Sequence, residues 1–157
     1  LKDKTLLVVG GGNIGGRVAE FMSPFMKVLI FDILHNDIEE LPALIKQADG
    51  ITLHIPKTDQ NKAFMDIEKL GLMKKDAILI NTARGNLVDE DALYDSIKSG
   101  KIRAAFDVFW KEPYLGKLTE LSPDKFFMTP HIASTCEGFL KGCREGLDSL
   151  CVDLKND

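Results

Sequence analysis

The chain has 157 residues, of which 45% are hydrophobic and 28% are charged, a balance typical of one globular domain and not of a disordered segment. Its formal net charge of −4 offers no basic surface of the kind that binds nucleic acid. No apolar run reaches the roughly 20 residues of a membrane span. We therefore expect neither nucleic acid nor a membrane among the partners.

Short apolar runs alternate with amphipathic segments along the chain. The runs are typical of strands buried on both faces of a parallel sheet, and they predict strands over residues 5–9, 27–32, 51–55, 77–81, 103–106 and 126–128. The other segments predict helices over residues 13–22, 41–47, 66–72 and 136–154, and between Asp89 and Gly100. This alternation indicates an α/β fold, a doubly wound parallel sheet in three α/β/α layers. Right-handed crossovers would then gather the carboxyl ends of the strands at one edge, where ligands bind.

The first predicted strand runs into a glycine-rich loop, Gly10-x-Gly12-x-x-Gly15, which opens the first predicted helix. Gly10 permits a tight turn, Gly12 lets a pyrophosphate approach the backbone, and Gly15 lets helix and strand pack closely. Asn13 and Ile14 lie at the helix N-terminus, where free N–H groups and the positive end of the dipole favour phosphate. The loop and its context predict a Rossmann-type dinucleotide site.

Asp32 ends the second predicted strand, which is where an acid that recognises the adenosine ribose is expected. Its carboxylate can accept hydrogen bonds from the ribose hydroxyls. It would also repel the 2′-phosphate of NADP, by roughly 4 kcal/mol for two unit charges about 4 Å apart at an effective dielectric of about 20. The sequence therefore predicts NAD as the cofactor.

Three polar segments follow later predicted strands, so they should open at the same edge as the glycine loop: residues 81–85, 107–113 and 129–133. They bring one cation, Arg84, one carboxylate, Glu112, and one imidazole, His131. A guanidinium can bind a carboxylate and polarise a neighbouring carbonyl. The imidazole can exchange a hydroxyl proton near neutral pH, and the glutamate can bond its other ring nitrogen and fix its tautomer. The trio suits hydride transfer to or from an α-hydroxy or α-keto acid.

The order of these motifs resembles that of the D-isomer-specific 2-hydroxyacid dehydrogenases, which include phosphoglycerate, glycerate, D-lactate and formate dehydrogenases. The resemblance covers essentially the whole chain and rests on the glycine loop, N-x-x-R-G at 81–85, D-V-x-x-x-E-P at 107–113 and T-P-H at 129–131. It implies an NAD-dependent enzyme in which Arg84, Glu112 and His131 are catalytic. It also implies a set of residues along the cofactor: Asp107 at the nicotinamide carboxamide, Thr82, Ala83, Arg84 and His131 on the nicotinamide side, and His54 and Pro56 on the adenosine side.

The chain departs from the family's pattern in three ways. Family members carry a second, substrate domain, whereas the cofactor domain accounts for residues 1–157. We therefore expect the substrate domain to be absent from this chain, which would bind NAD with little or no turnover of a small 2-hydroxy or 2-keto acid. The segment from Asp32 to Asp49 lacks the family's extra helix and small strand, so the adenine pocket is expected to be shallower. Asn61 stands where the family often has threonine. The family also makes a homodimer possible.

Two other functions are open alternatives. Some relatives are NAD-sensing corepressors without enzymatic activity, although three retained catalytic residue types argue against a binding module of that kind. Short-chain dehydrogenases use a Tyr-x-x-x-Lys pair, which Tyr94 and Lys98 match superficially, but these two residues belong to the helix after Asp89, away from the strand ends.

The cysteines and histidines carry no metal or disulfide pattern. Cys136, Cys143 and Cys151 are spaced by seven and eight residues, which places them on one stripe of the last predicted helix. Reduced, buried thiols are expected, and they favour the cytoplasm. The histidines are scattered without ligand-like spacing, so no metal site is expected.

Overall fold

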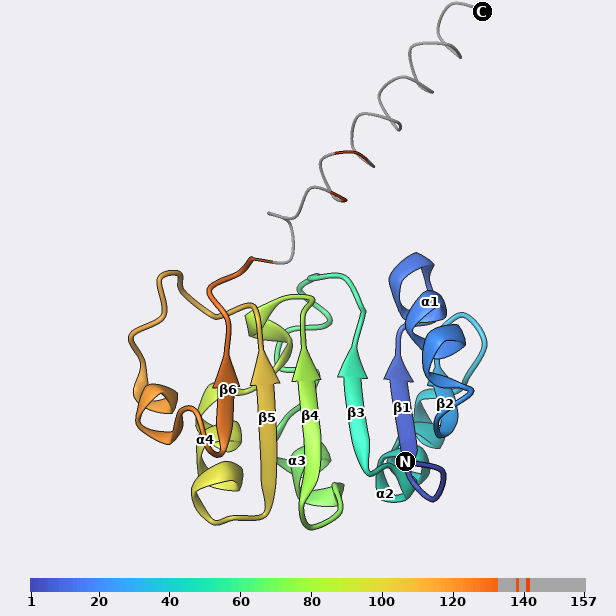
Figure 1. Ribbon diagram of the computed structural model, residues 1–157, viewed down its shortest axis with the longest axis horizontal. Helices are drawn as coiled ribbons and strands as arrows, with labels where there is room; N and C mark the ends of the chain where they lie inside the picture. The colour runs from blue at the N-terminus through green and yellow to red at the C-terminus, as the bar shows by residue number, and fades with distance from the viewer. Residues whose placement is uncertain (133–137, 139–140, 142–157) are drawn as a thin grey trace, which may run out of the picture.

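The computed structural model describes residues 1–132, 138 and 141 (Figure 1). Within this part of the chain, six parallel strands form one sheet in the order β2-β1-β3-β4-β5-β6. The strands are β1 (Thr5–Val9), β2 (Lys27–Phe31), β3 (Gly50–Leu53), β4 (Ala77–Asn81), β5 (Ile102–Phe106) and β6 (Phe126–Met128). The predicted doubly wound α/β fold is confirmed.

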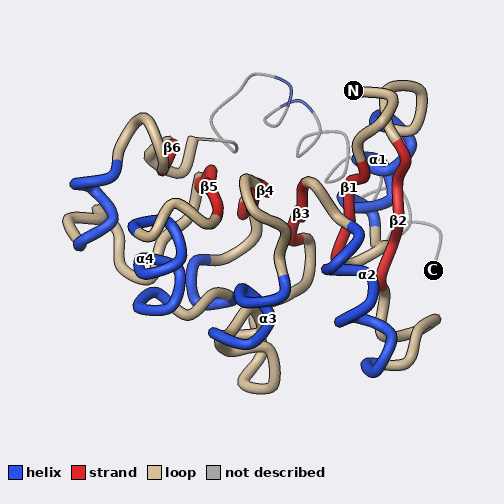
Figure 2. Tube along the Cα trace, turned by 90° about the horizontal axis from the view of Figure 1, so that it is seen from below, coloured by secondary structure: helices blue, strands red, loops and turns tan. Residues whose placement is uncertain are grey.

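Helices cover both faces of the sheet (Figure 2). They are α1 (Asn13–Met22), α2 (Leu41–Gln47), α3 (Ile67–Leu72) and α4 (Glu90–Lys98), with short 3-10 helices at η1 (Ile38–Glu40), η2 (Gly85–Leu87) and η3 (Lys117–Leu121). The side chains of Asp66 and Asp89 accept hydrogen bonds from the backbone N–H groups of Lys69 and Ala92, and so begin α3 and α4. The predicted start of α4 is thereby confirmed.

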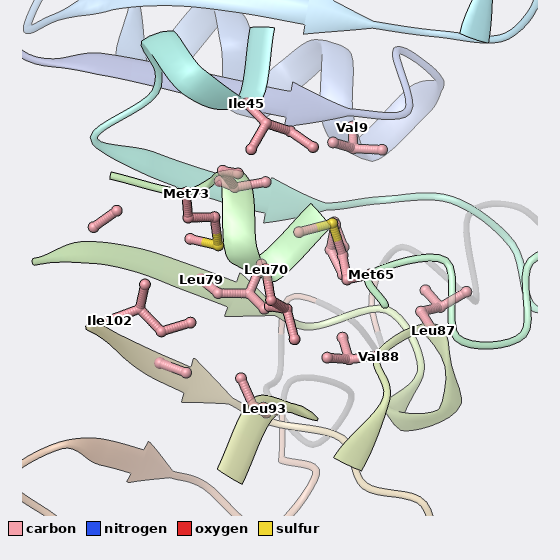
Figure 3. Close-up of a cluster of buried hydrophobic side chains, with 14 of the residues drawn as sticks. Val9, Ile45, Met65, Leu70, Met73, Leu79, Leu87, Val88, Leu93 and Ile102 are labelled. Atoms are coloured by element: carbon pink, nitrogen blue, oxygen red, sulfur yellow. The ribbon is translucent and has the colours of Figure 1, made fainter. Parts of the chain in front are cut away.

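The buried residues form two clusters because neighbouring strand residues point to opposite faces. Leu6 and Val8 of β1 pack with Ala19 of α1 on one face. On the other face, Leu7 and Val9 join a larger cluster with residues of α2, α3 and α4, and Figure 3 shows part of it: Val9, Ile45, Met65, Leu70, Met73, Leu79, Leu87, Val88, Leu93 and Ile102. Each fully buried Leu or Ile side chain contributes about 1.5–3 kcal/mol. This core fixes the strand ends that carry the polar loops.

The prediction that residues 27–32 form a strand buried on both faces is wrong. β2 is the edge strand of the sheet, and Ile30 is 45% exposed whereas Phe31 is buried. The strand also ends before Asp32, whose backbone N–H donates to the Asn36 side chain. β3 ends at Leu53 instead of residue 55. The predicted helix over 136–154 and the three cysteines lie outside the described residues, apart from Gly138 and Lys141.

Candidate active site

The glycine loop turns tightly between β1 and α1. Gly10 has φ +97°, a conformation that favours glycine, and a Cβ there would lie 2.7 Å from the His54 carbonyl oxygen. A Cβ on Gly15 would lie 1.8 Å from the Gly10 carbonyl oxygen, so the predicted close packing at Gly15 is confirmed. A Cβ on Gly12 would meet no protein atom within 4 Å. The protein itself therefore requires glycine at positions 10 and 15 but leaves the space above Gly12 open.

Asp32 lies at the mouth of this loop and is held by two backbone donors. Its Oδ2 accepts from the Gly11 N–H at 2.7 Å, and its Oδ1 accepts from the Leu34 N–H at 3.0 Å. The hydrogen bonds from Leu34 and Gly11 lower the pKa of the Asp32 carboxyl. The side chain is thus a fixed anion that also ties the glycine loop to the end of β2.

A groove runs along the carboxyl edge of the sheet from Asp32 to Arg84. It consists of a cavity of about 610 Å³ beside Asp32 and one of about 510 Å³ beside Arg84, and both are lined by His54, Ile55 and Pro56, which follow β3. Further predicted cofactor residues line one part or the other: Gly10, Gly12, Ile14, Thr82 and Ala83. Four other predicted cofactor residues line neither part: Asn13, Gly15, Asp107 and His131. The two parts meet at residues 54–56, so together they run from the residue after β2 to the loop after β4.

His54 lies in the middle of this groove, and Asn61 lies in the part beside Asp32. His54 is half-buried, its Nε2 lies 3.0 Å from the Thr52 hydroxyl, and burial lowers the pKa of the ring. Asn61 lines the larger cavity and donates from its side-chain amide to the Pro56 carbonyl at 2.9 Å. Asn61 therefore holds the loop after β3, a role that its sequence position alone did not indicate.

Arg84 lies in the loop after β4 with an exposed side chain. Its Nη1 donates to the Ala83 carbonyl at 2.5 Å. Asn81, at the end of β4, is fully buried and bonds both Ala83 and Arg84. A Cβ on Gly85 would lie 2.1 Å from the Phe109 carbonyl carbon, so only glycine fits where this loop meets the segment after β5. Asn81 and Gly85 belong to the N-x-x-R-G motif, but their roles in holding this loop could not be predicted from the motif alone.

His131 and Glu112 are paired, as the sequence predicted. The His131 Nδ1 lies 2.9 Å from Glu112 Oε2 and 3.1 Å from Oε1, and each side chain is 40% exposed. Glu112 Oε1 also accepts from the Phe109 backbone N–H at 3.1 Å. The hydrogen bond from His131, followed by that from Phe109, lowers the pKa of the Glu112 carboxyl. A cavity of about 380 Å³ adjoins the pair between Tyr114 and Met128.

Asp107 is 6% exposed and binds one residue on each side of His131. Its Oδ1 accepts from the Thr129 hydroxyl at 2.6 Å and from the Ile132 N–H at 3.0 Å. Between these contacts His131 adopts φ +54°, which is uncommon for a residue with a side chain. Glu112 holds the ring while Asp107 holds the loop, so the D-V-x-x-x-E-P segment positions the imidazole.

Tyr94 and Lys98 form a structural contact and not the Tyr-x-x-x-Lys pair of a short-chain dehydrogenase. Lys98 Nζ lies 2.6 Å from the Tyr94 hydroxyl, which bonds Glu120 of η3. The pair thus links α4 to η3 and does not line the groove. Among the described residues, no cluster of three or more histidine, cysteine or acidic side chains could hold a metal ion. No helix in the described part of the chain is long and apolar enough to cross a bilayer.

The chain is similar to known proteins over most of its length. Residues 1–133 match the model of the D-isomer specific 2-hydroxyacid dehydrogenase, NAD binding domain. The chain is 40% identical over 148 residues to hydroxypyruvate reductase of Thermotoga maritima, covering 87% of this chain and 48% of that protein.

Two solved structures are also similar. D-lactate dehydrogenase from Aquifex aeolicus, complexed with NAD and lactic acid, has a TM-score of 0.82 at 34% identity, covering 98% of this chain and 54% of that one. An acyclic imino acid reductase in complex with NADPH and D-Arg has a TM-score of 0.76 at 35% identity, covering 84% of this chain and 44% of that one. The chain thus spans about half the length of the proteins it matches.

Proposed function

The chain belongs to the D-isomer specific 2-hydroxyacid dehydrogenase family as its NAD-binding domain, and we propose that it serves hydride transfer between NAD and a D-2-hydroxy acid or the corresponding 2-keto acid. The observation that carries the proposal is the His131–Glu112 hydrogen bond of 2.9 Å, at the same sheet edge as the groove. A carboxylate at Nδ1 holds the proton there and leaves Nε2 to exchange a proton with the substrate oxygen.

The remaining groups have separate tasks in this reaction. Arg84 has an exposed guanidinium that can form paired hydrogen bonds with the substrate carboxylate. When bound in the groove, NAD supplies the carbon that accepts the hydride, and NADH supplies the hydride in the reverse direction. The open space above Gly12 and the N-terminus of α1 fit the pyrophosphate. We assign Asp107 to the carboxamide, in addition to the bonds it makes around His131.

We further propose that the site prefers NAD to NADP. Asp32 is a fixed carboxylate with a lowered pKa, so it would be charged when a 2′-phosphate approached it. Calorimetric titration with both cofactors tests this, with Asp32→Asn as the variant and the exposed Asp124→Asn as the matched control. We expect the preference for NAD to fall in Asp32→Asn only. Equal affinity of the unaltered chain for NAD and NADP would contradict the assignment.

A substrate domain elsewhere in the same polypeptide is proposed to close over the groove, since relatives are about twice as long as this chain. The test is turnover of the natural full-length gene product with NADH and 2-keto acids such as glyoxylate and hydroxypyruvate. Absence of turnover with every 2-keto acid, together with NAD-dependent capture of a partner peptide, would instead support the corepressor-like alternative. A cytoplasmic location and a homodimer stay predictions.

A further inference from the structure

Asn81 stands out as a buried polar side chain at the end of β4. The described residues contain three buried polar or charged side chains: Thr52 lies within β3, Asn81 ends β4, and Asp107 directly follows β5. Asn81 is fully buried, with 0% of its surface exposed. A buried amide is costly unless both of its ends are bonded. Its two partners therefore explain why this residue is at this position.

Both partners of the amide lie in the loop that carries Arg84. Asn81 Oδ1 accepts from the Ala83 N–H at 3.0 Å, and Nδ2 donates to the Arg84 carbonyl at 2.8 Å. A backbone N–H can only donate and a carbonyl can only accept, so these partners fix the orientation of the amide. An aspartate of the same shape would set an acceptor against the Arg84 carbonyl, and a leucine would leave both partners unbonded.

The same loop is fixed on its other side by Gly85. The Gly85 Cα packs against the Phe109 backbone so closely that a Cβ would lie 2.1 Å from the carbonyl carbon. Asn81 and Gly85 therefore bracket the backbone of Arg84, whose guanidinium is exposed. A displacement of about 1 Å of a substrate-binding group can lower turnover about 10²-fold.

We propose that Asn81 is a positioning residue that acts through Arg84: its side-chain amide sets the loop so that the guanidinium meets the substrate carboxylate. This inference rests on the proposed function, in which Arg84 binds that carboxylate. It goes further because it states that the side chain at the end of β4 must be an amide, and that another polar group would not suffice.

The test compares Asn81→Asp with Asn86→Asp in the natural full-length gene product. Asn86 is partly exposed and lies in η2 of the same loop, so the control makes the same change of charge nearby. We expect Asn81→Asp to raise KM for the 2-keto acid and to lower kcat/KM about 10- to 100-fold. Asn86→Asp should leave both unchanged. Equal effects of the two substitutions would overturn the proposal.

A double-mutant cycle with Arg84→Ala then separates positioning from a general structural effect. If Asn81 acts through Arg84, Asn81→Asp should cause little further loss in the Arg84→Ala background. Free guanidinium added to the assay should rescue Arg84→Ala and the double variant to the same degree, since it does not depend on the loop. The same factor of loss with and without Arg84 would refute the proposal.

Two further outcomes are distinguishable. If Asn81→Asp does not fold, as judged by its Tm, the same double-mutant cycle is measured with Asn81→Ser in its place. The serine hydroxyl can bond only one of the two partners well. Should Arg84→Ala leave turnover unchanged, the role of Arg84 in the proposed function fails, and the role of Asn81 fails with it.

Discussion

Glu112 has two hydrogen-bonding tasks, one toward the His131 ring and one toward the Phe109 backbone. Replacing it with glutamine keeps the shape but removes the charge that favours a proton on Nδ1. We expect Glu112→Gln to lower kcat/KM of the natural gene product about 10-fold or more, within the range that oriented acid–base groups provide. The control is Glu20→Gln, an exposed position on α1. Unchanged turnover in Glu112→Gln would mean that the glutamate does not assist the histidine.

The same glutamate makes stability depend on pH. Its pKa is lowered below the ordinary 4.5 in the folded protein, mainly by His131. A lowered pKa stabilises the folded state above the unfolded value, and this stabilisation is lost as pH falls through the folded value. In urea unfolding at several pH values, the chain should be more stable than Glu112→Gln near neutrality, and the difference should vanish in acid. A difference that grows on acidification would contradict the cause we give.

The charged candidate residues were easier to predict from the sequence than the residues that hold them in place. Arg84, Glu112 and His131 follow strands within recognisable motifs, and the bond between Glu112 and His131 was expected and is confirmed. The tasks of Asn81 and of Asp107 around His131 depend on how the loops fold back on the strand ends. A linear pattern does not contain that geometry. A polar residue directly at the end of an apolar strand was the available signal.

At the scale of elements, the β1–α1 loop separates two kinds of glycine. Gly15→Ala would force a Cβ to 1.8 Å from the Gly10 carbonyl oxygen, so we expect a loss of about 1–3 kcal/mol or more in the free energy of unfolding. Gly12→Ala meets no protein atom, and Gly12 has φ −67°, which alanine adopts readily. This variant should keep its stability but bind NAD about tenfold more weakly. Equal NAD affinity would remove Gly12 from the pyrophosphate site.

The order of the strands and helices could be predicted from the sequence, whereas the position of each strand within the sheet could not. Alternating apolar runs and capping residues such as Asp89 indicated the strands and α4. Apolar content did not reveal that β2 is an edge strand, because burial depends on which strands flank it in the sheet. The 3-10 helices η1, η2 and η3 were also missed, since three to five residues carry too little periodicity to predict.

At the scale of the whole molecule, the chain has a groove at the carboxyl edge of the sheet and the His131–Glu112 pair, but it spans only about half the length of its relatives. If a second domain supplies the rest of the cleft, residues 1–157 alone should bind NAD and show little or no turnover. Binding should raise Tm, since about 100 times Kd of ligand adds about 2.7 kcal/mol to the folded state.

Unlike residues 1–157 alone, the natural full-length gene product should turn over substrate. Its NAD affinity should be similar to that of residues 1–157, because the groove is built from one domain. Thermal unfolding with and without NAD, and initial rates at saturating NADH, measure the two properties separately. Rates for residues 1–157 equal to those of the full-length protein would show that no second domain is needed. Loss of NAD binding in residues 1–157 would show that the groove itself depends on the rest of the polypeptide.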